Sequence, residues 1–262
     1  MPDKTLKGTL SYGAITLGLL FIVIIPIPVI FLDYLISLNL VFSLLLLIDV
    51  ALSKNKEYTL FPKILLVFIL FNAAINIITV RLILILGNEF DSLFSGFISF
   101  WLKFDKFKFI CLAAVAVIFI IGIVIYFRLI IKIIRRVTEL SLIYSTENFP
   151  FKIACFEKEY NGRIITEDDL INKKRKLKKK TDFSFSFAQV CKVVSIYEKL
   201  RIVFILINSA GGFFIATRMR GDLPEDALIT FLSFAVSCGI LSLIPAFLLA
   251  FSMKIVLCAH EE

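Results

Sequence analysis

The chain has few of the side chains on which most enzymes depend. Its 262 residues include a single histidine, His260, beside two glutamates at the end. The five cysteines are scattered and form no C-x-x-C pair, which argues against a disulfide framework or a zinc site. A P-loop, a G-x-S-x-G motif and a dinucleotide fingerprint are also absent. We therefore expect no enzymatic activity, no cofactor and no metal site.

Polar residues are scarce as well, and hydrophobic ones make up 59% of the chain, with 28 phenylalanines and a mean hydropathy of +0.93. A soluble domain cannot bury so much apolar surface, and about 20 apolar residues span a bilayer as a helix. The composition predicts an all-α, polytopic membrane protein. The first apolar run lacks an A-x-A-like cleavage site, so we expect a retained helix. The six candidate spans lie near residues 12–32, 34–52, 61–86, 107–131, 199–217 and 227–253.

The basic residues predict the orientation of these helices, because lysine and arginine stay preferentially in the cytoplasm. With a cytoplasmic N-terminus, the cytoplasmic segments hold all but six of the 29 basic residues. The net charge of +8 then faces the anionic lipid of the cytoplasmic leaflet. Nucleic-acid binding is disfavoured, because no aromatic side chains interrupt the lysine run. The six external basic residues would be Arg81, Lys103, Lys106, Lys108, Arg218 and Arg220.

A polar insert separates the fourth and fifth spans and divides the chain into three parts. Residues 1–135 hold four spans, residues 136–198 form a cytoplasmic insert, and residues 199–262 hold two spans and a short tail. A charged stripe that includes Lys132, Arg136 and Glu139 predicts that the fourth helix continues into the insert with a wet basic face.

Turn and cap signals subdivide the insert. Pro150 and the pair Asn161-Gly162 predict turns instead of a continuous helix. Residues 166–182 then read as a helix with Thr166 as N-cap, acids in the first turn and lysines in the last. The lysine run is either a solvated face or an interaction surface. After Asp182, phenylalanines alternate with small residues up to residue 187, which allows a short strand or a helix start.

Within the third span, Asn72, Asn76 and Thr79 share one helical face, which we expect to point away from lipid. Arg81 can reach the interface with its long side chain. The predicted third, fifth and sixth spans contain no carboxylate and no histidine. A proton pathway needs such groups inside the membrane, so this pattern argues against one.

Two prolines, a carboxylate and an amide lie where the first apolar run meets the second, in IPIPVIFLD (25–33) and Asn39. This block resembles L-P-L-P-x-x-L-L-D followed by L-N in the FHIPEP family, the FlhA-type export-gate proteins of flagellar and virulence type III secretion. Four more blocks are similar in the right order. They are the F-P-x-x-L-L-V to T-R-L block at 60–84, the K-x-x-x-R-x-x-E pattern in the insert, LINSAGGFF at 206–214 and SLIPAFLL at 242–249.

The resemblance covers about residues 15–250 and implies a bacterial inner-membrane protein that assembles with other export subunits as a homo- or hetero-oligomer. We expect Pro26, Asn76, Gly212 and Pro245 to lie in a common helical core. The family-matched residues that we predict to be structural or to mediate interactions are Pro26, Pro28, Asp33, Asn39, Pro62, Asn76, Arg81, Lys132, Arg136, Glu139, Asp182, Lys192, Asn208, Gly211, Gly212 and Pro245.

The chain departs from the family pattern where the family has ionisable groups. Asn72 stands where the family pattern has an arginine. Ala188, Tyr197 and Cys238 stand where it has aspartates. Family members are also described with eight spans and a large cytoplasmic domain. We therefore expect either a divergent, shortened paralogue with a scaffold role or one piece of a gate split across two genes, and the loss of these groups argues against proton coupling.

Two alternatives come from other classes. A small solute or ion permease would use Asp33, Asn39, Asn72 and Asn76 as a pathway, although no inverted repeat is visible. The chain could also be a decaying gene product without a present role.

Overall fold

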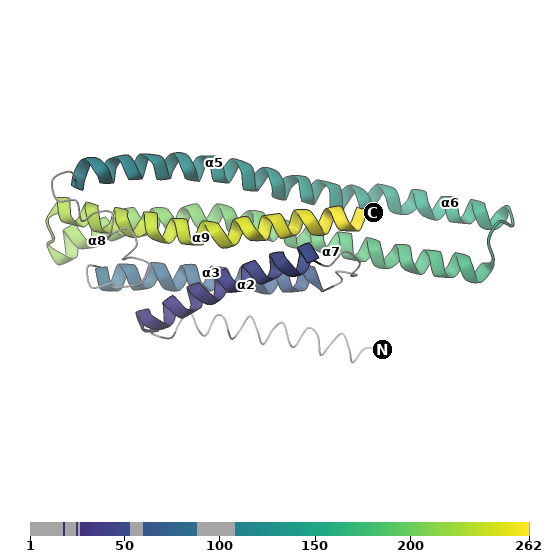
Figure 1. The fold of residues 1–262 in the computed structure, drawn as a ribbon, viewed down its shortest axis with the longest axis horizontal. Coiled ribbons are helices and arrows are strands. Elements are labelled where there is room, and N and C mark those ends of the chain that lie inside the picture. Colours follow the sequence, from purple (N-terminus) through teal and green to yellow (C-terminus); the bar gives the residue numbers. More distant parts are fainter. Residues whose placement is uncertain (1–17, 19–24, 26, 53–59, 88–107, 262) are drawn as a thin grey trace.

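The computed structural model describes residues 18, 25, 27–52, 60–87 and 108–261 (Figure 1). These residues contain helices and no strands, which confirms the predicted all-α class. The helices labelled η are single π-helical turns. The elements in chain order are α2 (Val29–Leu52), α3 (Phe61–Leu86), α5 (Lys108–Ile143), η2 (Tyr144–Asn148), α6 (Phe149–Asn161), α7 (Glu167–Leu206), η3 (Ile207–Gly211), α8 (Gly212–Ile215), η4 (Ala216–Arg220) and α9 (Pro224–Glu261).

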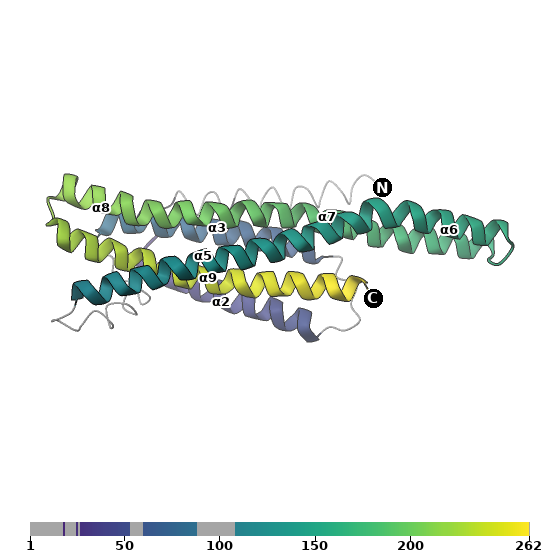
Figure 2. The same ribbon diagram turned by 90° about the horizontal axis from the view of Figure 1, so that it is seen from above.

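Long helices lie side by side along one axis and form a bundle, from which the α6–α7 hairpin projects at one end (Figures 1 and 2). We call this hairpin, residues 149–182, the arm. Within the described residues, four stretches are long and apolar enough to cross a membrane: α2, α3, the run from α7 to η4, and α9. The first predicted span lies largely outside the described residues, and the fourth corresponds to the first part of α5. The count of six spans therefore stays a prediction.

Helix α7 is longer than the sequence pattern suggested. We expected a helix that ends near Asp182 and left residues 183–187 open, but one helix runs from Glu167 to Leu206. The segment contains no glycine and no proline, so no residue in it breaks the helix. The rings of Phe183 and Phe187 stack one turn apart at 5.7 Å, which gives the alternating stretch a helical pairing.

The turn predicted at Pro150 is wrong. Helix α5 passes through the π-helical turn η2 directly into α6, and Pro150 occupies the first turn of α6. A proline is tolerated there because the π-helical turn already departs from the i to i−4 hydrogen-bond pattern of the α-helix. The turn at Asn161-Gly162 is confirmed, since α6 ends at Asn161 with Gly162 as its C-cap.

The predicted cap of α7 is also confirmed. The amide of Asp169 donates to Thr166 Oγ1 at 3.3 Å, and the Thr166 amide donates to Asp169 Oδ2 at 3.3 Å, which completes a capping box. Hydrogen bonds from Thr166 hold the pKa of the Asp169 carboxyl below its usual value. The arm is therefore a hairpin with a defined turn and a capped second helix.

The buried core consists of two hydrophobic clusters. One lies toward the arm and includes Phe61, Ile134, Phe187 and Met253, while the other lies toward the opposite end and includes Ile78 and Phe231. Neither cluster contains a residue of the arm. The predicted domain boundaries at 135 and 198 fall inside α5 and α7 and match no helix end, and the three-part division stays a prediction.

Candidate functional site

Two oppositely charged side chains of α7 form a buried ion pair inside the bundle. Arg201 Nη1 lies 3.0 Å from Glu198 Oε2, and the side chains are only 1% and 2% exposed. The spacing i, i+3 brings both groups to the same face of the helix. Their contact has the distance of an ion pair but not the angles of a hydrogen bond. A buried charge is costly in a low-dielectric interior, so each ion compensates the other.

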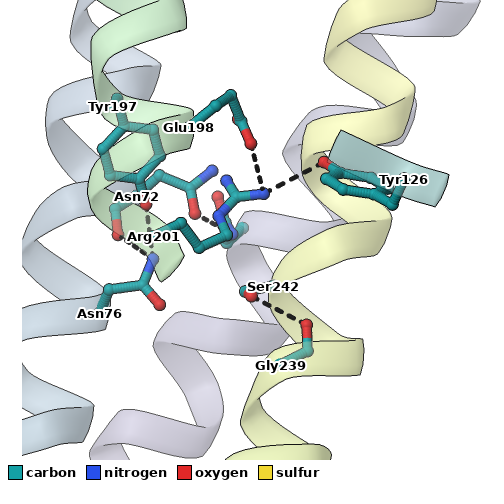
Figure 3. A network of polar contacts seen from close by, with 9 residues as sticks. Asn72, Asn76, Tyr126, Tyr197, Glu198, Arg201, Gly239 and Ser242 are labelled. Atoms are coloured by element: carbon teal, nitrogen blue, oxygen red, sulfur yellow. Dashed lines mark hydrogen bonds and ion pairs between the residues drawn. The ribbon is translucent and has the colours of Figure 1, made fainter. Parts of the chain in front are cut away.

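Two tyrosines surround the Arg201 guanidinium (Figure 3). Arg201 Nη1 donates to the hydroxyl of Tyr126 on α5 at 3.2 Å, and its guanidinium carbon lies 5.2 Å from the centre of the Tyr197 ring. A cation over a desolvated aromatic face is stabilised by the ring quadrupole. The hydrogen bond therefore joins α5 to α7, while the cation–π contact lies within α7.

Asparagine side chains extend this network to two more helices. Asn76 on α3 donates through Nδ2 to the hydroxyl of Tyr197 and to the carbonyl oxygen of Asn72. Asn39 on α2 donates through Nδ2 to Asn72 Oδ1 at 3.2 Å. Four helices thus meet through polar contacts between the two hydrophobic clusters, where lipid offers no alternative partner. We call these residues, Asn39, Asn72, Asn76, Tyr126, Tyr197, Glu198 and Arg201, the polar network.

The expectation for the third span is confirmed. Asn72 and Thr79 are buried, and the half-buried Asn76 points to α7. Of the other predicted residues, Asn39 belongs to the network. Asp33 is also buried, but it lies two turns earlier on α2, where its carbonyl oxygen accepts a hydrogen bond from Ser37.

Several predicted residues shape the bundle without joining the network. Arg81 reaches back to the chain before α2, where its Nη2 donates to the carbonyl oxygen of Ile25 at 2.7 Å. Pro28 is exposed before α2, and Pro62 is buried in the first turn of α3. Pro245 is buried inside α9. Pro26 lies outside the described residues.

The glycine pair packs as the sequence suggested. Gly212 is buried, and a Cβ atom added there would lie 2.0 Å from the ring of Phe231 on α9. Gly211 is half-buried, near Leu84 of α3. Asn208, expected to bond to another helix, is buried, but its Oδ1 has no hydrogen-bond partner among the described residues. Among the described residues, this part of the bundle is joined by side chains of α9 and α3 that pack directly on the two glycines.

The charged residues predicted for the insert are all exposed. Lys132, Arg136 and Glu139 lie on the outer surface of α5, and Asp182 and Lys192 lie on that of α7. None of the five takes part in the polar network. Their roles in interactions therefore stay a prediction.

Sequence reasoning missed Tyr126, Glu198 and Arg201. Glu198 was assigned to a polar insert, and the fifth span was expected to contain no carboxylate, but α7 carries Glu198 into the bundle without interruption. The signal was present in Y-E-K-L-R, where opposite charges three residues apart directly precede the apolar run from Ile202. The sequence around Tyr126 does not predict its role, since that role depends on how α5 packs on α7.

Two of the four departures from the family pattern lie at this site. Asn72 and Tyr197 occupy two of the four positions where an ionisable residue was expected, and both belong to the network. Ala188 is buried and Cys238 is half-buried. No group of three or more metal-ligating side chains occurs in the described part of the chain. The network can therefore hold four helices in register through neutral amides, tyrosines and one compensated ion pair.

Comparison with known proteins reveals one family over nearly the whole chain. The FHIPEP family matches residues 19–261. The flagellar biosynthesis protein FlhA of Borreliella burgdorferi is 31% identical over 247 residues, which are 92% of this chain and 35% of that protein. The low calcium response locus protein D of Yersinia pestis is 26% identical over 95% of this chain and 35% of its own length.

The invasion protein InvA of Salmonella typhimurium is 28% identical over 87% of this chain and 33% of its own length. The chain thus spans about a third of the curated relatives that it matches. No solved structure matches it. The family match covers every helix of the described bundle, so the chain is a member of the FHIPEP family.

Proposed function

We propose that this chain is a membrane component of a flagellar or type III protein-export apparatus and acts there as a scaffold. The observation that carries the proposal is the family match over residues 19–261. Relatives named for flagellar biosynthesis and for invasion support the same class of system. The buried network supports a scaffold role, because it joins α2, α3, α5 and α7 through short polar contacts.

We assign the protein to the bacterial inner membrane with the arm in the cytoplasm. The arm, the ends of α2 and α9 and the start of α3 lie at one end of the bundle (Figure 1). Exposed cations such as Lys132, Lys192 and Lys254 lie toward that end. By the positive-inside rule we propose that this end is cytoplasmic, and the cytoplasmic N-terminus that the charge pattern predicts is part of the same proposal.

The partners in this proposal are other membrane subunits of the export apparatus, in a homo- or hetero-oligomer. Lys132, Arg136, Glu139, Asp182 and Lys192 are exposed near the base of the arm, where they can position it against neighbouring subunits. The protein has no enzymatic role, and it does not couple protons to export. The Glu198 carboxylate lies 3.0 Å from Arg201 inside the bundle, and we assign this pair a structural role.

The decisive experiment deletes the gene and scores secretion and motility, with complementation by the wild type and by an Arg201→Met variant. We expect the deletion to lower secretion or motility and the wild type to restore it. Complementation by Arg201→Met should fail, because that variant leaves Glu198 buried and unpaired. Normal secretion and motility in the deletion strain would refute the proposal.

A second experiment tests assembly. After extraction in mild detergent, the protein should migrate as a large oligomer together with export subunits. Recovery solely as a monomer would contradict the scaffold role. Ion or solute flux through liposomes containing the purified protein alone, abolished by Asp33→Ala, would favour a permease instead.

A further inference from the structure

The arm carries a band of unpaired cations. Between Asp169 and Asp182, every charged residue of α7 is basic, seven in all. Two of these are neutralised by α6, since Lys173 Nζ and Lys174 Nζ lie 2.7 Å from carboxylate oxygens of Glu159 and Glu157. The other five are exposed, and none forms an ion pair within the part of the chain that the structure describes. They are Arg175, Lys176, Lys178, Lys179 and Lys180, which we call the cation band.

The packing of the arm turns the cation band outward. Leu170, Lys173, Leu177 and Thr181 recur every three or four residues on α7 and are buried or half-buried, so they mark the face of α7 that packs inside the arm. The cation band occupies the remaining circumference. Five like charges within six residues repel one another, and α6 supplies no further carboxylate to compensate them.

The cation band lies too far along the arm to act on lipid headgroups. Lys192 is the next exposed cation of α7 toward the membrane, 12 residues after Lys180. At about 1.5 Å per residue, Lys180 lies about 18 Å beyond Lys192, and Arg175 about 26 Å beyond it. Exposed charges act over about 8 Å at physiological ionic strength. Because the arm continues the long axis of the bundle, this distance leads away from the membrane (Figures 1 and 2).

We propose that the cation band is a docking surface for a protein partner with an acid-rich segment. Charge complementarity speeds encounter and selects the partner. The band contains no aromatic side chain on which bases could stack, which favours a protein over single-stranded nucleic acid. The inference does not depend on the export assignment, since it rests only on the charges and geometry of the arm.

The test measures peptide binding to the full chain in nanodiscs of neutral lipid. The probe is a fluorescent peptide of alternating glutamate and glycine, followed by anisotropy. The test variant replaces all five residues of the cation band by glutamine. The matched control replaces five exposed cations elsewhere: Arg128, Arg135, Lys152, Lys199 and Lys254. Circular dichroism verifies that both variants keep the helix content of the wild type.

We expect the band variant to bind the peptide at least about tenfold more weakly and with a smaller salt dependence. The control should stay close to the wild type. Equal loss in both variants would show a response to net charge alone and overturn the proposal. Loss of binding to phosphatidylglycerol vesicles or to a DNA duplex in the band variant, with peptide binding unchanged, would also overturn it and assign the surface to lipid or nucleic acid.

Discussion

The bundle and the arm use ion pairs in opposite ways, and α7 contributes to both. In the bundle, Glu198 and Arg201 are 2% and 1% exposed and lie 3.0 Å apart. In the arm, Lys174 and Glu157 are 38% and 52% exposed and lie 2.7 Å apart. The arm pair is shorter, yet water screens it, so we expect it to matter less. Burial, not distance, decides how strongly a fold depends on an ion pair.

The largest effect should follow from breaking the buried pair on one side only. Arg201→Met leaves a carboxylate without a counterion, which costs about 3–5 kcal/mol of unfolding free energy. Adding Glu198→Gln removes the orphaned charge and should recover most of that loss. Equilibrium unfolding in mixed micelles, followed by circular dichroism, measures both. If the double variant is as unstable as the single one, the unpaired Glu198 carboxylate is not the cause of the lost stability.

A smaller loss should come from filling the closest helix contact in the bundle. Gly212→Ala places a methyl group 2.0 Å from the Phe231 ring, and overpacking of this kind costs about 1–3 kcal/mol. The control is Gly122→Ala, since a Cβ atom on Gly122 of α5 meets nothing within 4 Å. The same unfolding assay should show no loss for the control. Equal losses would point to backbone effects instead of packing.

In the arm, we expect a substitution to lower stability only locally. Thr166→Ala removes the cap of α7 and costs about 1 kcal/mol of local helix stability. Hydrogen exchange should accelerate at the amides of the first turn of α7, while the unfolding temperature of the bundle stays unchanged. Thr166→Ser keeps the hydroxyl and should behave as the wild type. A global loss of stability would show that the arm and the bundle unfold together.

The smallest effect belongs to the exposed ion pair. Lys174→Ala should change the unfolding free energy by less than about 1 kcal/mol, and the change should shrink further in high salt. A double-mutant cycle with Glu157→Ala isolates the pair from the other charges of the arm. A coupling as large as that between Glu198 and Arg201 would erase the distinction between the two regions.

Local signals predicted much of this fold. The apolar runs predicted the all-α class, and Thr166 with Asp169 predicted the start of α7 because a capping box involves only neighbouring residues. Asn161-Gly162 predicted the arm's turn for the same reason. The turn predicted at Pro150 was wrong, because a π-helical turn allows this proline to occupy the first turn of α6.

The polar network was only partly predictable. Asn72 and Thr79 share a face of one helix, so periodicity predicted their burial. The contacts of Asn39 with Asn72 and of Asn76 with Tyr197 join residues far apart in the chain, which no local pattern encodes. Glu198 was misplaced because its helix was expected to end and restart, and a single unbroken helix carried it into the core.

The unbroken course of α7 has a mechanical consequence. Glu198 and Thr166 lie on the same straight rod, separated by 32 residues or about 48 Å. If the rod pivots at the buried pair, a tilt of about 5° displaces the turn of the arm by about 4 Å. A contact at the turn of the arm would therefore act, through α7, on the level of the bundle at which four helices are joined.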